Sequence, residues 1–170
     1  MGPVGHGVIS TGVGGGVWAV TGSLPAAALT LTVGVLMDVD HVYDYYKWYI
    51  RRQPNKIYLW FHAWEYSIAG LLLLIWFYHP LLLAAALAHL AHVITDHFHN
   101  QLSPLGYSLT YRIARGFEAP TIAPTHNVST TYWHLLKALP FGRRLAPWFE
   151  RRAAEIDRQS AAAPSANQVE

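Results

Sequence analysis

The sequence predicts an all-α protein: a membrane-embedded four-helix bundle with a cytoplasmic C-terminal extension. Three observations support this fold class. Over half of the 170 residues are hydrophobic and only 13% are charged, roughly half the charged share of an ordinary soluble domain. Four apolar segments occur within the first hundred residues. Lys and Arg are absent before Lys47 and between Lys56 and Arg112, as expected where cations flank membrane spans on one side.

The first two apolar segments are short. Residues 1–21 are rich in Gly and Val, which close packing of membrane helices tolerates. Ser23 and Pro25 then indicate the start of a second helix over about 26–37, continuing as a polar aromatic segment over 41–50. Both apolar cores are shorter than the roughly 20 residues that a full membrane span needs. We therefore expect them either to cross the membrane with their flanking residues included or to form a shallow hairpin. Residues 1–22 lack the basic region of a signal peptide.

Two longer helices follow the basic loop at 51–56. They are expected over 58–78 and 81–99, each near spanning length, with aromatic residues gathered at their ends. Residues 107–111 alternate weakly, which indicates an extended loop or a short strand, and 119–131 form a loop rich in Pro and Thr.

The remaining chain is more polar. A short amphipathic helix is expected over 132–139, and a basic helix facing water or the membrane surface over 143–158. We therefore divide the chain into a membrane-embedded helical domain (1–118), a cytoplasmic or membrane-surface helical extension (119–159) and a disordered tail (160–170).

Histidine and carboxylate side chains lie where these helices begin or end. His92 and Asp96 share one stripe of the fourth helix. With four crossings, the positive-inside rule makes both termini and the 51–56 loop cytoplasmic. The start of helices one and three and the end of helices two and four then meet at the cytoplasmic face. The candidate metal ligands at this level are His6, Asp38, Asp40, His41, His62, His92 and Asp96.

A metal site explains why such residues occur at membrane depth. Ionisable groups there are costly and survive by pairing or by binding ions. The chain has no cysteine, so His and carboxylate ligands favour Zn, with Mn or Fe as alternatives. The ligands exceed the needs of one tetrahedral ion, so one or two ions are expected. Glu65, one turn after His62 on the predicted helix, and Asp40 are the candidate catalytic bases.

The pattern of an early His, a helix ending in Asp-x-Asp-His, a His at the start of the third helix and His-x-x-x-Asp at the end of the fourth resembles a known family. It is similar, over roughly residues 5–115, to small bacterial inner-membrane proteins classed as metal-dependent hydrolases (the DUF457-like group). The resemblance implies a bacterial inner-membrane location and the same seven ligand positions. We expect hydrolysis of an ester or phosphoester in a lipid or amphiphile by a metal-activated water.

Three alternatives remain open. A non-catalytic metal-binding protein or an ion or proton transporter would use the same residues as a relay. Two histidines could instead ligate a haem between helices, or the chain could be a soluble metalloenzyme with an apolar core. The net charge of only +2 does not indicate that the protein binds nucleic acid. His126 and His134 are not assigned to the site.

Overall fold

The computed structural model describes residues 2–100, 102–125, 128–139 and 141–162. These residues are mostly helical and contain no β-strand, apart from one isolated bridge between Lys56 and Glu118, so the all-α prediction is confirmed. The α-helices are α1 (Pro3–Thr21), α2 (Leu24–Leu36), α3 (His41–Tyr45), α4 (Trp64–Trp76), α5 (Pro80–His99), α6 (Leu109–Ala114), α7 (Ala119–Ile122), α8 (Val128–Ala138) and α9 (Gly142–Ala162).

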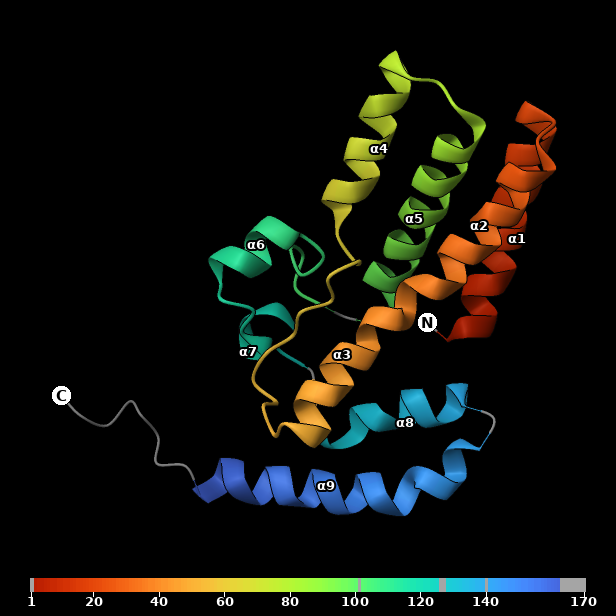
Figure 1. Ribbon diagram of the computed structural model, residues 1–170. Coiled ribbons are helices and arrows are strands. Elements are labelled where there is room, and N and C mark those ends of the chain that lie inside the picture. Colours follow the sequence, from red (N-terminus) through yellow and green to blue (C-terminus); the bar gives the residue numbers. More distant parts are fainter. Residues whose placement is uncertain (1, 101, 126–127, 140, 163–170) are drawn as a thin grey trace.

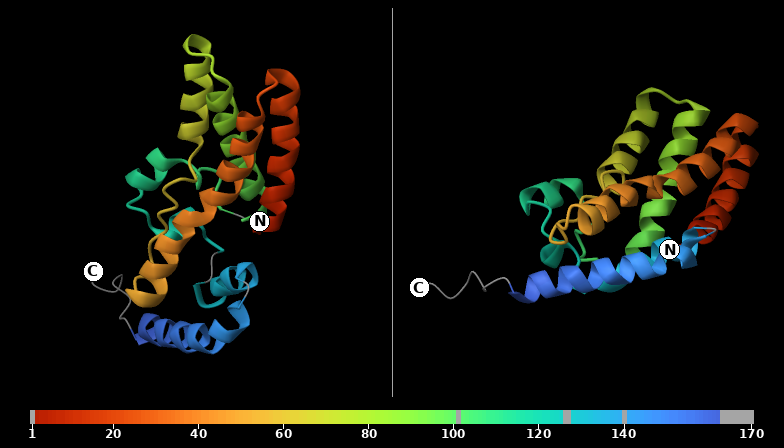
Figure 2. Two further views of the ribbon diagram at one scale, coloured as in Figure 1. Left: turned by 45° about the vertical axis from the view of Figure 1, so that its right-hand side comes forward. Right: turned by 60° about the horizontal axis from the view of Figure 1, so that its bottom comes forward.

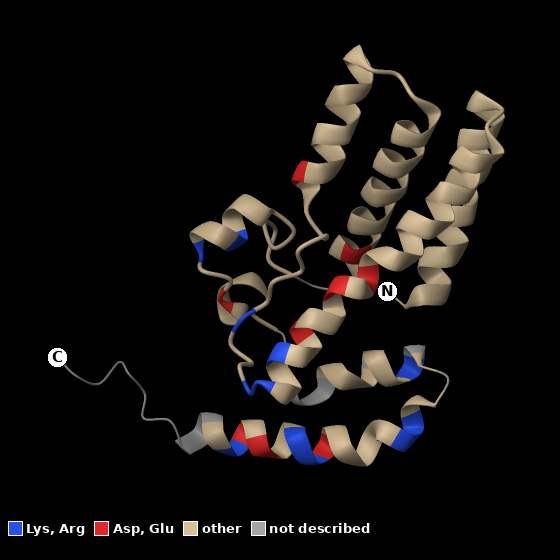
Figure 3. Ribbon diagram, in the orientation of Figure 1, with Lys and Arg blue, Asp and Glu red and all other residues tan. Residues whose placement is uncertain are grey.

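Helices α1, α2, α4 and α5 lie side by side, with α5 packed against the other three. The α1–α2 and α4–α5 turns are at one end, and α1 begins where α2 and α5 finish, at the other (Figures 1 and 2). Two described helices are long and apolar enough to cross a membrane, Leu24–Ile50 and Pro80–His99, while Trp64–Trp76 is apolar but shorter. The described Lys, Arg, Asp and Glu residues lie at or beyond the end opposite the two turns (Figure 3).

Small residues allow α1 and α2 to approach closely. A Cβ on Gly14 would lie 2.5 Å from Thr30 Oγ1 and 2.9 Å from the carbonyl oxygen of Ala27. A Cβ on Gly34 would collide with the side chain of Ser10. The hydroxyl of Thr30 donates to the carbonyl of Ser10 across the same interface (3.0 Å). This small-residue interface is a common way to pack helices in lipid, and it sets the position of the first turn of α1.

Helix α2 continues directly into a 3₁₀ turn, Met37–Asp40, then α3 and a π turn, Tyr46–Ile50, as predicted for the polar aromatic segment. In a 3₁₀ turn, side chains three residues apart eclipse one another. Asp38 and His41 are therefore aligned, with 3.8 Å between Asp38 Oδ1 and His41 Nδ1. The local tightening of the helix falls on the residues that carry the candidate chemistry.

The structure differs from the predictions in three segments. The third helix begins at Trp64 rather than near residue 58, because the preceding segment is irregular: Leu59 has φ 42°, residues 60–61 form a turn, and Ala63 is extended, with φ −139° and ψ 127°. Residues 109–114 form α6 instead of the extended loop or short strand predicted at 107–111, because Ser108 accepts a hydrogen bond from the backbone N–H of Tyr111 and caps the helix. The region after residue 118 also starts with one helical turn, α7, within the predicted loop.

The C-terminal helices extend the fold beyond α1, α2, α4 and α5. Helices α8 and α9 pack against each other and run across the end of these four helices rather than along them (Figure 1). Their inner faces join α3 and the loops in one hydrophobic core, which includes Tyr49, Ile57, Tyr107, Ile122 and Phe149. This core fixes the loops that carry His62.

Candidate metal centre

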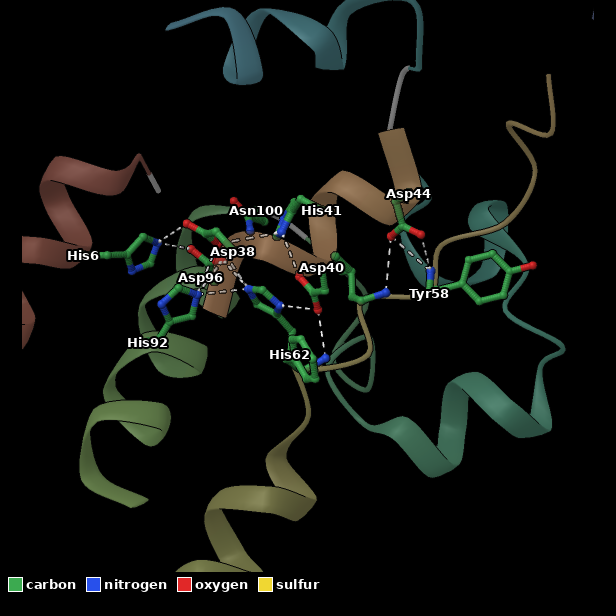
Figure 4. Close-up of polar contacts among 12 residues, drawn as sticks. His6, Asp38, Asp40, His41, Asp44, Tyr58, His62, His92, Asp96 and Asn100 are labelled. Atoms are coloured by element: carbon green, nitrogen blue, oxygen red, sulfur yellow. Dashed lines mark hydrogen bonds and ion pairs between the residues drawn. The ribbon is translucent and has the colours of Figure 1, made fainter. Parts of the chain in front are cut away.

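Five of the seven predicted ligands converge between α1, α2 and α5 (Figure 4). They come from the first turn of α1, the 3₁₀ turn, the loop before α4 and the last two turns of α5: His6, Asp38, His62, His92 and Asp96. Within the described residues, four of them form one group whose atoms could hold a metal ion, His6, Asp38, His92 and Asp96, while Asp38 and His62 belong to a second such group with His41. Apart from Asp38, all are buried.

Four of these side chains present atoms at the spacing of a tetrahedral ligand set. The Nε2 atom of His62 lies 3.4 Å from Asp38 Oδ1 and 3.5 Å from Asp96 Oδ2. The Nε2 atom of His92 lies 3.3 Å and 3.7 Å from the same two oxygens, and the two Nε2 atoms are 3.0 Å apart. Tetrahedral ligands at about 2.0–2.1 Å from Zn²⁺ are separated by roughly 3.3–3.4 Å, so these five separations lie within a few tenths of an ångström of that spacing.

The outer nitrogens of both imidazoles are engaged elsewhere. His62 Nδ1 contacts Asp40 Oδ2 at 3.0 Å, and His92 Nδ1 contacts the carbonyl oxygen of Gly34 at 2.8 Å. A carbonyl accepts only, so His92 carries its proton on Nδ1, and the carboxylate favours the same tautomer in His62. If both imidazoles are neutral, the Nε2 lone pairs of His62 and His92 therefore face each other. Two lone pairs this close repel each other unless a proton or a cation lies beside them.

His6 extends the group from α1. Its ring stacks on His92, with centroids 3.9 Å apart, and its Nε2 lies 3.0 Å from Asp96 Oδ1. Neither nitrogen of this buried ring makes a hydrogen bond of good geometry within the described residues. A buried polar group without such a bond costs roughly 1–3 kcal/mol, and a metal ion would satisfy it.

Asp40 acts behind His62 instead of facing the four-atom group. Its Oδ2 accepts from the backbone N–H of Phe61 (2.8 Å) as well as contacting His62, while its Oδ1 lies 3.2 Å from His41 Nδ1. A carboxylate bonded to the outer nitrogen of a ligand histidine orients that ring. Asp40 was predicted as a ligand and a base, and the structure gives it this orienting position.

The backbone around His62 is held from three sides. Besides Asp40, His89 Nε2 lies 2.9 Å from the carbonyl oxygen of Phe61 while its Nδ1 contacts Ser67 Oγ at 2.6 Å. Arg112 Nη1 donates to the carbonyl of His62 at 2.9 Å and to that of Gly106 at 3.2 Å. These contacts replace the helical hydrogen bonds that the segment lacks.

The charges around His62 affect its protonation. Burial lowers the pKa of His62, but hydrogen bonds to three carboxylates outweigh burial and hold that pKa well above its usual range. Arg112 is 0% exposed, and burial lowers its pKa from the usual value. The three carboxylates around His62, those of Asp38, Asp40 and Asp96, therefore favour a positive charge beside them. A proton or a metal ion at the Nε2 atoms would supply that charge.

His41 and Asp38 form the accessible edge of the cluster. Their side chains are 30% and 25% exposed, while the rings of His62 and His92 are closed off from solvent. The His41 ring lies edge-on to that of His62, at 4.8 Å between centroids. With Asp38 and His62 it also completes a second group with metal-ligand spacing.

Glu65 lies outside the cluster. Its Oε1 accepts from Ser108 Oγ (2.8 Å) and from the backbone N–H and hydroxyl of Thr110 (3.0 and 2.9 Å). Its Oε2 accepts from the backbone N–H of Leu109 (3.0 Å). Glu65 therefore caps the N-terminus of α6, and we do not retain it as a base. The expected helical alignment with His62 is wrong because His62 precedes the helix.

Several further residues have roles that pattern reasoning did not assign. Asp44 accepts from the backbone N–H groups of Tyr58 and Leu59 at 3.1–3.2 Å and so secures the loop that leads to His62. Only its i, i+4 spacing from Asp40 on a predicted helix could have drawn attention to it. His99 is exposed and bonds the carbonyl of Thr95, so it does not join the cluster. His126 and the side chain of His134 lie outside the described residues.

No protein-family model, curated protein or solved structure matches this chain.

Proposed function

We propose that the protein is a membrane-embedded, metal-dependent hydrolase that cleaves an ester or phosphoester of a lipid or amphiphile. The observation that carries the metal is the 3.0 Å approach of His62 Nε2 and His92 Nε2, with both outer nitrogens committed to acceptors. His62, His92, Asp38 and Asp96 would hold the ion, with His6 beside Asp96. Zn²⁺ fits two imidazoles and two carboxylates best. A bound ion would supply Lewis acidity and a nucleophilic water at neutral pH.

Membrane embedding is supported by the outward faces of the bundle. Large apolar side chains on α1, α2, α4 and α5 are exposed, among them Val8, Leu31, Leu72, Ile75 and Phe98. Large contiguous apolar surfaces are uncommon on soluble monomers, and exposed side chains of this kind suit a lipid environment. The proposed orientation, with both termini on the cytoplasmic side of a bacterial inner membrane, follows the side on which the Lys and Arg residues lie.

Access to the site supports an amphiphilic substrate. Asp38 and His41 are the accessible edge, and Leu36, Val39 and Val42 on the same continuous helix are more than half exposed. A polar ester group can approach the edge while its apolar part contacts these side chains and the surrounding lipid.

His41 is positioned to take up a proton during hydrolysis. Asp40 Oδ1 lies 3.2 Å from His41 Nδ1, which favours the tautomer with its lone pair on Nε2. A His–carboxylate pair at the accessible edge of a ligand set has the arrangement of a general base.

The transport hypothesis has less support. A relay through the bilayer needs polar groups along both halves of the bundle, yet residues 7–37 and 66–91 contain no Asp, Glu, Lys or Arg.

Full-length protein purified in detergent tests the proposal. We expect Zn²⁺- or Mn²⁺-loaded protein to release head group or fatty acid from a phospholipid and lysophospholipid panel, and His92→Ala to be inactive. Stoichiometric metal without hydrolysis of any substrate would favour a non-catalytic metal protein.

A further inference from the structure

We infer that the α8–α9 corner docks onto the anionic headgroup surface of the membrane. The corner is defined here by Leu139, Phe141 and Leu145 with the cations Lys137, Arg143 and Arg144, all exposed. The inference rests on the proposed membrane embedding and adds a lipid-binding surface to it.

The chemistry of the corner suits a bilayer interface. Residues 119–149 contain no Asp or Glu, so nothing acidic within this stretch offsets the three cations. The Phe141 ring is 68% exposed, and the guanidinium of Arg144 lies 5.4 Å above it. Exposed aromatic and aliphatic side chains ringed by Lys and Arg are typical of segments that bind anionic lipid.

The corner is also hollowed. A cavity of about 530 Å³ is lined by apolar side chains together with Lys137, Arg143 and Arg144. Three cations around one hollow can contact the phosphate of a lipid headgroup, and cation–phosphate contacts of this kind are strengthened by charge.

The inner faces of the two helices explain why these residues remain outside. Tyr132, Leu136 and Phe149 are buried in the shared core, and the Phe149 ring packs edge-on to Tyr49 (4.9 Å). The helices are thus fixed to the body of the protein by one face, while the apolar residues of the corner project away from that core.

The position of the corner selects a membrane over a soluble partner. In Figures 1 and 2 the start of α9 lies on the same side of the molecule as the N-terminal end of α1, where the described charged residues gather (Figure 3). If α1 enters the bilayer from this end, the corner lies at headgroup level. Each basic residue near an anionic surface strengthens attraction by roughly fivefold.

Site-directed spin labelling of the full-length chain tests the inference, and the absence of cysteine makes single labels straightforward. Labels replace Phe141, Glu150 on an exposed position of α9, and Ile75, which is 70% exposed on α4. Each is measured in detergent and in nanodiscs of phosphatidylcholine with or without phosphatidylglycerol, comparing collisions with oxygen and with a water-soluble nickel chelate.

We expect the Ile75→Cys label to lie in lipid in both nanodiscs, the Phe141→Cys label to enter lipid only with phosphatidylglycerol, and the Glu150→Cys label to stay in water. Adding Arg143→Gln and Arg144→Gln should lower the lipid-bound fraction at 141 by roughly tenfold or more. A 141 label that stays in water, is indifferent to anionic lipid, or is already buried in detergent through contact with another copy would overturn the inference. An Ile75 label in water would instead overturn membrane embedding.

Discussion

His62 Nε2 and His92 Nε2 lie 3.0 Å apart, although the two histidines are thirty positions apart and come from a loop and from α5. Each ring is fixed from behind, by Asp40 and by the carbonyl of Gly34. The approach is thus built by the fold rather than by a flexible pair of side chains. It brings two buried Nε2 atoms to one point beside the carboxylates of Asp38 and Asp96.

Arg112 is predicted to act as a positioning residue for His62. Its Nη1 bonds the carbonyl of His62, so Arg112→Gln should weaken metal binding about 10–100-fold, the usual effect of losing an outer partner of a ligand. Metal titration by competition with a chelating dye measures this change.

Arg115→Gln is the matched control, because Arg115 is an exposed cation just beyond the same short helix. Equal losses of affinity in both variants would assign the effect to net charge instead of position. Thermal unfolding of metal-free protein would identify a variant that simply fails to fold.

The α1–α2 contact should control the site through Gly34. A Cβ there collides with Ser10, so Gly34→Ala should cost about 1–3 kcal/mol of stability and lower metal content by moving His6 and the acceptor of His92. A Cβ on Gly16 would meet no atom of another segment within 4 Å, so Gly16→Ala should leave stability unchanged or raise it.

In the double variant Gly34→Ala with Ser10→Gly, the two Ser10 side-chain atoms that the new Cβ would meet are absent. This variant should therefore recover much of the lost metal. Recovery is the decisive result, since a defect unrelated to the helix contact would persist in the double variant.

Substitutions of His41 and Glu65 should have different effects, the first on hydrolysis and the second on stability. We expect His41→Ala to keep most of the metal and to lose about 10²-fold or more in hydrolysis if it is the base. Glu65→Gln should keep hydrolysis while lowering the unfolding temperature, because it weakens the four hydrogen bonds to the start of α6. Metal lost together with activity in His41→Ala would make His41 a ligand.

The pH dependence of stability should differ between metal-free and metal-loaded protein. The pKa of His62 in the folded state lies above its unfolded value. In metal-free protein its protonation therefore stabilises the fold fully below about pH 6.5, and this contribution is lost as the pH rises through the folded pKa.

A bound metal ion needs neutral imidazoles, so the stability that the ion adds increases as the pH rises. The difference in unfolding temperature between the two forms should therefore increase from about pH 5.5 to about pH 8. Circular dichroism with and without a chelator measures it, and a difference that shrinks with pH would contradict imidazole ligation.

Much of the site could be predicted because its parts follow from local rules. His92 and Asp96 are four residues apart on a helix, which places them on one face. The alternation of apolar segments and cations also predicted that His6 and Asp38 would meet at the end of the bundle that holds the charged residues. The all-α class follows from the long apolar runs in the same way.

The remaining details depend on contacts between distant segments. Glu65 pairs with α6 more than forty positions later, and no spacing rule predicts such a partner. The same is true of the segment before α4: Asp40, His89 and Arg112 satisfy its backbone groups, so it remains irregular and His62 is not helical. Tertiary hydrogen bonds here override the local preference for helix.

X-ray absorption at the metal edge, on full-length protein purified in detergent and loaded with Zn²⁺, measures whether His62 and His92 ligate one ion. We expect a stoichiometric ion with two imidazole nitrogens and carboxylate oxygens at about 2.0–2.1 Å, with the imidazole scattering reduced in His62→Ala and in His92→Ala. An absence of stoichiometric metal, or a bound ion whose spectrum is unchanged in both variants, would contradict it.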